Sequence, residues 1–289
     1  NGESLSSFIF LVLKYLHNRR VITRNEEEQG KRKKRKKRKA KGGDTAPKYI
    51  NPVAEYLPVE KIENGIIYTK DHRYVKVVEG LQNTLKIAVM GLIIGILIGT
   101  LIATIRVIPK YKVLPRVLNA ICTFYVALFR GTPMVVQLLV FYYVVLPIIG
   151  TNLPSVSVAI VVFGLNSGAY ISEIMRSGIQ SVDYGQMEGG RSVGLSFSTT
   201  MMRIVIPQAV KNILPTLGNE FIALIKETSV VSFVGATDLY VAFSYIGSNS
   251  YEFMVPYITM ALIYIVIVCI ITLLIKIMER SLKKSDRRN

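Results

Sequence analysis

The chain has 289 residues, of which 51% are hydrophobic, and 36 Lys and Arg against 19 Asp and Glu give it a formal net charge of +17. Residues 87–105 contain no charge over 19 positions, and residues 256–275 contain none over 20. A bilayer-spanning helix needs about 20 predominantly apolar residues. The composition therefore excludes an ordinary soluble domain and predicts an all-α integral membrane protein.

Residues 1–79 are predicted to form a basic, largely disordered N-terminal extension. Within it, the apolar stretch 5–16 is short for a span and fits the end of a helix, an interfacial helix or a signal-like segment. Residues 31–39, KRKKRKKRK, are all basic. No aromatic residue interleaves with them, which favours a solvated tail near anionic lipid over nucleic-acid binding. A linker follows at 42–80, with a short strand predicted at 65–69.

Residues 80–282 are predicted to form the transmembrane domain, followed by a basic C-terminal tail at 283–289. Hydropathy indicates five spans, at 83–107, 116–147, 155–180, 208–235 and 254–278. The fourth is interrupted by charged and amide side chains, which inside a membrane usually face protein or a water-filled cavity and mark function. In the first span Gly91, Gly95 and Gly99 recur every four residues, a pattern typical of close helix packing.

Lys and Arg gather in the loop after the first span, in the loop after the third span and at the C-terminus. The two other loops of the core, 148–154 and 236–253, contain neither residue type. The positive-inside rule therefore places the loop between the third and fourth spans in the cytosol.

That cytosolic loop has a distinctive pattern. Glu188-Gly189-Gly190 precedes Gly194, and nine residues then separate Gly194 from Ile204, which leads into Ile206-Pro207. We expect a short helix ending near Gly190, a turn at Gly194 with φ > 0, and a second helix capped by Ser196 or Ser198. The spacing resembles the EAA loop, E-A-A-x3-G-x9-I-x-L-P, of bacterial ABC importer permeases, with glycine at both alanine positions.

Further segments extend the resemblance over residues 80–280. They are GLQNTL (80–85), RGTP (130–133), LNSGAYISE (165–173), GIQSV (178–182), GNEF (218–221) and KETSVVS (226–232). Together they resemble the permease subunit of polar amino acid ABC importers of the histidine/glutamine/arginine group.

The resemblance implies a MetI-like core of five transmembrane helices that works as a homodimer or with a related permease. It also implies a dimer of cytoplasmic ABC ATPase subunits, an extracytoplasmic amino-acid-binding protein and a multi-pass location in the bacterial cytoplasmic membrane. ATP and Mg would be held by the partner ATPase. The ATPase-coupling residues implied within the loop at 185–207 are Glu188, Gly189, Gly190, Arg191, Gly194 and Pro207.

Polar residues inside the spans are the candidates for the substrate path, because a zwitterionic amino acid needs partners for its carboxylate and its ammonium group. The candidates are Arg130, Gln137, Asn166, Ser167, Tyr170, Glu173, Glu220, Lys226, Glu227 and Thr228. Each also has a structural interpretation. Arg130 could pair with Glu173 or Glu227, and Lys226 with Glu227 in an ion pair that holds helices together.

No catalytic residue, metal site or cofactor of its own is expected in this chain. It contains no G-x4-G-K-[ST] phosphate-binding loop and no H-E-x-x-H motif, and its two His residues both precede the membrane core. An ion-coupled secondary amino acid transporter acting without an ATPase is the alternative function. That alternative predicts internal repeats with broken helices in matching positions.

Overall fold

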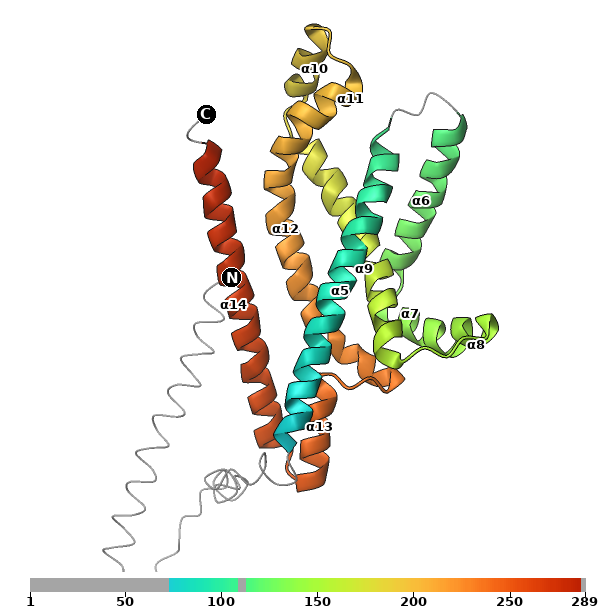
Figure 1. Ribbon diagram of the computed structural model, residues 1–289, viewed down its shortest axis with the longest axis vertical. Coiled ribbons are helices and arrows are strands. Elements are labelled where there is room, and N and C mark those ends of the chain that lie inside the picture. Colours follow the sequence, from blue (N-terminus) through green and yellow to red (C-terminus); the bar gives the residue numbers. More distant parts are fainter. Residues whose placement is uncertain (1–72, 109–112, 287–289) are drawn as a thin grey trace, which may run out of the picture. The chain divides into compact units, whose positions relative to one another are not determined.

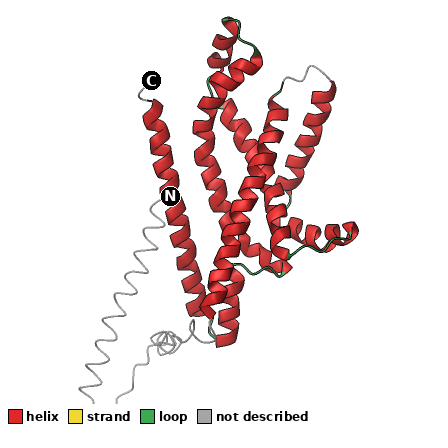
Figure 2. Ribbon diagram, viewed as in Figure 1, coloured by secondary structure: helices red, strands yellow, loops and turns green. Residues whose placement is uncertain are grey.

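The computed structural model describes residues 73–108 and 113–286 (Figure 1). All the regular elements in this part of the chain are helices, joined by short loops, and it contains no strand (Figure 2). The predicted strand at 65–69, the apolar segment at 5–16 and the basic run at 31–39 lie outside the described residues. In chain order the elements are α5 (Arg73–Val107), α6 (Val113–Gly131), α7 (Met134–Val140), η2 (Phe141–Val145), α8 (Leu146–Ile149), α9 (Ser155–Gln180), α10 (Tyr184–Ser192), α11 (Phe197–Thr200), η3 (Met201–Val205), α12 (Ile206–Glu227), η4 (Thr228–Val234), α13 (Leu239–Ser250) and α14 (Met254–Asp286).

Within the described chain, helices α5, α6, α9 and α14 are each long and apolar enough to cross a bilayer. Helix α12 and its neighbours from Phe197 to Val234 form a bent pair with α13, with an angle of 56° between the two parts. Counted as one span, the bent pair gives the five spans predicted from the sequence. The chain is therefore a multi-pass helical membrane protein.

The second predicted span, 116–147, is wrong as a single helix. Helix α6 ends at Gly131, and Pro133 takes an extended conformation (φ −63°, ψ 140°) before α7 begins. Proline disfavours the helical conformation of the residue before it and supplies no N–H, so the helix stops here. The apolar stretch from Met134 to Ile149 then leaves the direction of α6 (Figure 1). At 1.5 Å per residue it is about 24 Å long, less than the roughly 30 Å of a hydrocarbon core.

The segment 236–253, predicted to be a loop, is also different in the structure. It contains α13, whose first turn is capped by Asp238, because the carboxylate accepts a hydrogen bond from the N–H of Val241 at 2.9 Å. Gly235 adopts φ +73° and ends η4, which redirects the chain into this helix. Hydropathy alone does not register such a cap.

Helices α5 and α9 pack with their backbones close together. A Cβ on Gly95 would lie 2.8 Å from the side chain of Ser167, and one on Gly99 would lie 2.7 Å from Ile171. In the same way, a Cβ on Gly164 of α9 would lie 2.5 Å from the side chain of Ile94 of α5. The prediction that the α5 glycines serve helix packing is confirmed, and these two helices form the centre of the fold.

The three basic segments that the sequence analysis placed in the cytosol lie at one end of the helical core. The C-terminal end of α5, the N-terminal end of α6, the α10–α11 turn and the C-terminal end of α14 all lie at one end, at the top of Figure 1. Helix α13 lies at the other end (Figure 1). The Lys- and Arg-bearing segments after α5, after α9 and at the C-terminus therefore share one end, as the positive-inside rule requires of cytoplasmic loops.

Candidate coupling loop and polar core

The glycine-punctuated loop folds into two short helices joined by a tight turn. Asp183 caps α10 by accepting a hydrogen bond from the N–H of Gly185 at 2.6 Å, and α10 continues to Ser192, past the predicted end near Gly190. Gly194 has φ +89°, which confirms the predicted left-handed turn. Of the two candidate caps, Ser196 is the one used, because its hydroxyl accepts from the N–H of Thr199 at 3.2 Å.

Most of the predicted coupling residues face outward. Gly190 is the exception, because it is buried against Thr200 and Ile204. Large apolar side chains are also exposed on this loop: Tyr184 at 72%, Val193 at 77% and Met202 at 64%. The exposed coupling residues are Glu188, Gly189, Arg191, Gly194 and Pro207. Apolar groups gathered among charges on a protruding loop are typical of a surface that binds another protein.

The loop is attached to the helices at both of its ends. The amide of Gln208 in α12 donates to the Gln186 side chain of α10 at 3.2 Å. The amide of Asn212, one turn further along α12, donates to the Ser181 hydroxyl at 2.8 Å. These contacts join α10 and the C-terminal end of α9 to α12.

In the polar core, Gln137 and Asn166 hold the break between α6 and α7. The Gln137 amide donates to the carbonyl oxygens of Phe129 and Thr132, at 2.8 and 3.0 Å, which the helix break leaves without helical partners. The Asn166 amide donates to the Gln137 side chain at 2.9 Å. Both side chains are buried, with 7% and 5% exposed. Their observed contacts are therefore structural, since they fix the break against α9.

Arg130 does not form either of the two ion pairs considered for it. Among the described residues, no carboxylate lies within ion-pair distance of its guanidinium. The guanidinium carbon instead lies 5.4 Å from the centre of the Tyr170 ring, a cation–π arrangement between α6 and α9. Both side chains are exposed.

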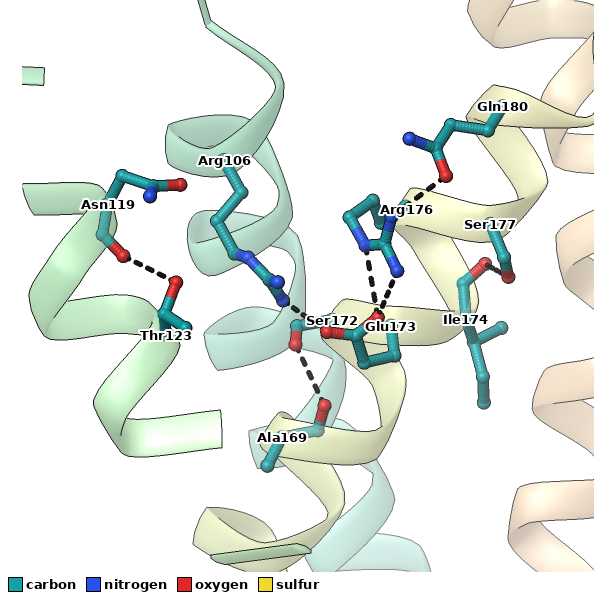
Figure 3. Close-up of polar contacts among 10 residues, drawn as sticks. All are labelled: Arg106, Asn119, Thr123, Ala169, Ser172, Glu173, Ile174, Arg176, Ser177 and Gln180. Carbon is teal, nitrogen blue, oxygen red and sulfur yellow. Dashed lines mark hydrogen bonds and ion pairs between the residues drawn. The ribbon is translucent and has the colours of Figure 1, made fainter. Parts of the chain in front are cut away.

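Glu173 lies between two arginines (Figure 3). Its Oε1 accepts from Arg106 of α5, and its Oε2 accepts from Arg176 of α9 at 2.7 and 3.0 Å. Arg176 also donates to Gln180 at 2.8 Å. The carboxylate therefore links the ends of α5 and α9 nearest to the α10–α11 loop.

The remaining candidates lie on α9, α12 and η4. The Ser167 hydroxyl donates to Glu220 at 3.0 Å, so this carboxylate faces α9. Thr228 is fully buried and donates to the carbonyl of Ile225. Lys226 and Glu227 are exposed, and no ion pair joins them in the described part of the chain.

Three polar residues make interhelical or intrahelical contacts but are not among the candidates predicted from the sequence. They are Arg106, Arg176 and Asn83. Arg176 follows Glu173 by three residues, a helical spacing that the sequence displays. The pairing of Arg106 with Glu173 depends on the register between α5 and α9, and the hydrogen bond from Asn83 to the carbonyl of Thr237 depends on the position of α13. Neither interaction has a local sequence signal.

Five spans, a protruding capped turn and polar groups within the helices define a membrane transport component. Residues 84–284 match the family described as "Binding-protein-dependent transport system inner membrane component", and the chain belongs to this family.

Known relatives share this core. The chain is 37% identical over 210 residues to the arginine transport system permease protein ArtQ of Bacillus subtilis, covering 73% of this chain and 94% of that protein. It is 37% identical over 206 residues to GlnP of Rickettsia bellii, a permease named for glutamine transport, covering 71% and 92%.

Two solved structures have the same fold. An amino acid ABC transporter crystallised with histidines superposes with a TM-score of 0.67 at 35% identity, covering 77% of this chain and 97% of that one. The methionine ABC transporter MetNI in an inward-facing conformation has a TM-score of 0.62 at 17% identity, which supports the fold alone.

Proposed function

We propose that this chain is the transmembrane permease subunit of an ATP-driven importer that moves a polar amino acid across the bacterial cytoplasmic membrane. The observation that carries the proposal is the loop from α10 to η3. It protrudes at the end of the core where the basic segments gather, and it exposes both charged and apolar side chains.

The proposed mechanism is alternating access driven from this loop. A dimer of cytoplasmic ABC ATPase subunits binds the loop, holds ATP and Mg, and closes when ATP binds. The permease holds neither ligand and catalyses no reaction. Loop movement is passed through the Gln186–Gln208 and Ser181–Asn212 contacts to α9 and α12. A second permease copy, identical or related, completes the path, and an extracytoplasmic binding protein delivers the amino acid.

The substrate path is proposed to follow the polar side chains of α6, α9 and α12 that keep polar atoms available. Arg130 and Tyr170 are exposed together, and Glu220 has Ser167 as its hydrogen-bond partner. Lys226 and Glu227 are exposed one turn or more beyond Glu220 on the same helix. The polar groups of the other four candidates are already hydrogen-bonded within the protein, so we assign these residues a supporting role. They are Gln137, Asn166, Glu173 and Thr228.

ATP-dependent amino acid uptake tests the proposal. The chain is reconstituted in proteoliposomes with its ATPase and binding protein, and the wild type is compared with Glu188→Lys and Gly194→Trp. We expect both variants to lose uptake and to lose the ATPase on co-purification. Glu79→Lys is the matched control, because it makes the same charge change on an exposed side chain of α5 and should retain the ATPase. Uptake driven by an ion gradient without any ATPase would instead establish the secondary transporter.

A further inference from the structure

The turn between α13 and α14 exposes a tyrosine in an unfavourable backbone conformation. Tyr251 has φ +53°, and in the described part of the chain it is the only residue other than glycine with a positive φ. Glycine is favoured at such a position because a side chain clashes with the left-handed backbone. The Tyr251 side chain is 93% exposed, and no hydrogen bond or ring contact joins it to another described residue. No contact within the described chain therefore offsets the cost of a tyrosine here.

The turn that carries Tyr251 is held by contacts on its other residues. The N–H of Glu252 donates to the carbonyl of Gly247 at 3.1 Å, and the Glu252 carboxylate accepts from the N–H of Met254 at 3.1 Å. A Cβ on Gly247 would lie 2.6 Å from the Phe253 ring, so this ring packs directly over the glycine. These contacts hold the turn in the conformation that exposes Tyr251.

Three further rings lie beside this turn. The rings of Tyr240 and Tyr257 are stacked, with centroids 6.5 Å apart, and the Phe253 ring lies 5.7 Å from that of Tyr257. Tyr240 and Phe253 are both partly open to the outside, at 37% and 46% exposed. Together with Tyr251 these three residues are called the aromatic patch. Glu252 is the only charged residue between positions 239 and 257.

The aromatic patch lies where α14 enters the bilayer, at the end of the core away from the coupling loop (Figure 1). Helix α14 is long and apolar enough to cross a membrane, and its uncharged stretch is 256–275. Tyr257 is the second residue of that stretch, and Tyr251 precedes it by six residues. The headgroup layer adds about 5–8 Å on each side of the hydrocarbon, the length of four or five helical residues. The patch therefore extends across the boundary between hydrocarbon and headgroups.

The surface of α14 continues the patch into the membrane. None of the most apolar 18-residue window of this helix is buried within the described chain. Large apolar side chains are exposed from the patch onward, at Ile258, Leu262 and Val266. This continuity favours lipid over a soluble protein as the partner of the patch.

We propose that the aromatic patch binds the bilayer surface on the side away from the coupling loop, with Tyr251 among the phospholipid headgroups. Tyrosine suits this position because its ring is apolar and its hydroxyl remains in the polar layer, and tyrosine is enriched at membrane–water interfaces. Residues 227–275 contain no Lys or Arg, so the patch fits zwitterionic headgroups and has no basic group that would select anionic lipid. Binding anchors the turn between α13 and α14 at a fixed depth, a role that none of the proposed transport steps supplies.

Tryptophan fluorescence in liposomes tests this anchor. The chain contains no Trp, so Tyr251→Trp introduces a single reporter. It replaces one exposed ring by another, so packing should be retained. The purified full-length variant is reconstituted in phosphatidylcholine that carries a nitroxide quencher either on the headgroup or near the end of an acyl chain. We expect both lipids to lower the emission, and the headgroup-labelled lipid to cause the larger loss.

Three further single-Trp variants serve as references. Val266→Trp lies in the middle of the uncharged stretch, at a side chain that is 55% exposed, and should show the opposite order of quenching. Tyr184→Trp replaces an equally accessible tyrosine, 72% exposed on the coupling loop, and should lose emission with neither lipid. Tyr240→Trp extends the test from one residue to the patch and should be quenched by both lipids.

Three results would overturn the proposal. In the first, Tyr251→Trp is quenched by aqueous iodide but by neither lipid, and added binding protein that shields it from iodide would identify a protein partner instead. The second is stronger quenching of Tyr251→Trp by the acyl-chain label, which would place the turn within the hydrocarbon. The third is an unquenched Tyr240→Trp, which would remove the patch from the membrane surface. None of these measurements involves ATP-dependent uptake, so the proposed function is tested separately.

Discussion

Gly190 in α10 packs directly against Thr200 in α11, across the turn made by Gly194. A Cβ on Gly190 would lie 2.5 Å from Cγ2 and 3.0 Å from Oγ1 of Thr200. The Thr200 hydroxyl is itself held, because it donates to the carbonyl of Ser196 at 3.0 Å. The alanine that the EAA pattern places at this position therefore does not fit beside this threonine.

Gly189, the other glycine that replaces an alanine, has a different environment. It is exposed, and a Cβ there would meet nothing within 4 Å. Alanine is favoured over glycine in a helix by about 1 kcal/mol, so Gly189→Ala should stabilise α10. Gly190→Ala should loosen the packing of α10 on α11, because overpacking costs about 1–3 kcal/mol. Hydrogen exchange of the α10 amides would show slower exchange for the first variant and faster exchange for the second.

The control for this pair is Thr200→Ser in the Gly190→Ala background. Serine removes Cγ2 but keeps the hydroxyl that bonds to Ser196, so exchange in α10 should return toward the wild-type rate. Faster exchange in Gly189→Ala than in the wild type would contradict the assignment of these two environments.

Local features of this loop could be predicted from the sequence. The positive φ at Gly194 and the Ser196 cap depend on residues within a few positions, so residue type and spacing are sufficient to place them. The same holds for the glycine repeat of α5, because one helix face is defined by its own periodicity.

Features that depend on two distant segments could not be predicted. The partner of Glu173 is set by the register of α5 against α9, and the sequence contains several arginines at plausible depth. The break after Gly131 is hidden from the hydropathy pattern for another reason. Pro133 and the three residues before it, Arg130-Gly131-Thr132, lie between two apolar stretches, and hydropathy averaged over a window does not register a single missing N–H.

The Glu173 cluster gives a second testable expectation. Glu173→Gln keeps the shape of the side chain but leaves Arg106 and Arg176 facing each other without a carboxylate. Hydrogen bonds to charged groups contribute about 1.5–3 kcal/mol each, so Tm should fall by several degrees. Glu79→Gln is the matched control. Its pair with Lys76 spans 3.5 Å with both side chains about half exposed, and such pairs contribute about 0–1 kcal/mol.

The arginines themselves provide a further check on that cluster. Arg106→Gln in the Glu173→Gln background should cost less than the two single changes added together, because the unpaired charge is removed with its partner. Strict additivity would show that the two side chains do not interact.

The α5–α9 contact gives a third expectation. Gly95→Ala places a methyl group where Ser167 lies at 2.8 Å, and the backbones of both helices must separate to admit it. We expect a marked loss of Tm and of folded yield in detergent. Gly131→Ala is the control, because it also replaces a helical glycine but meets nothing within 4 Å, and it should leave Tm unchanged or raised. An equal loss in both variants would show that helix packing is not the cause.

The last expectation concerns Glu220, whose hydrogen-bond partner is Ser167. Glu220→Gln keeps an oxygen that accepts from the Ser167 hydroxyl, so the packing of α12 on α9 and the Tm should change little. It removes the negative charge that the proposed path offers to the ammonium group of an amino acid. Losing one charge-assisted hydrogen bond, about 1.5–3 kcal/mol, corresponds to a loss of roughly tenfold or more in uptake.

Uptake in proteoliposomes at saturating ATP would measure this loss, with ATPase co-purification as a check on assembly. Ser167→Ala is the matched variant, because it removes the hydroxyl and leaves the carboxylate in place, so uptake should fall less than in Glu220→Gln. Wild-type uptake in Glu220→Gln with the ATPase bound would place Glu220 outside the path. If Glu220→Gln lowers both Tm and uptake, the role of Glu220 is structural. Its carboxylate would then serve to hold α12 against α9.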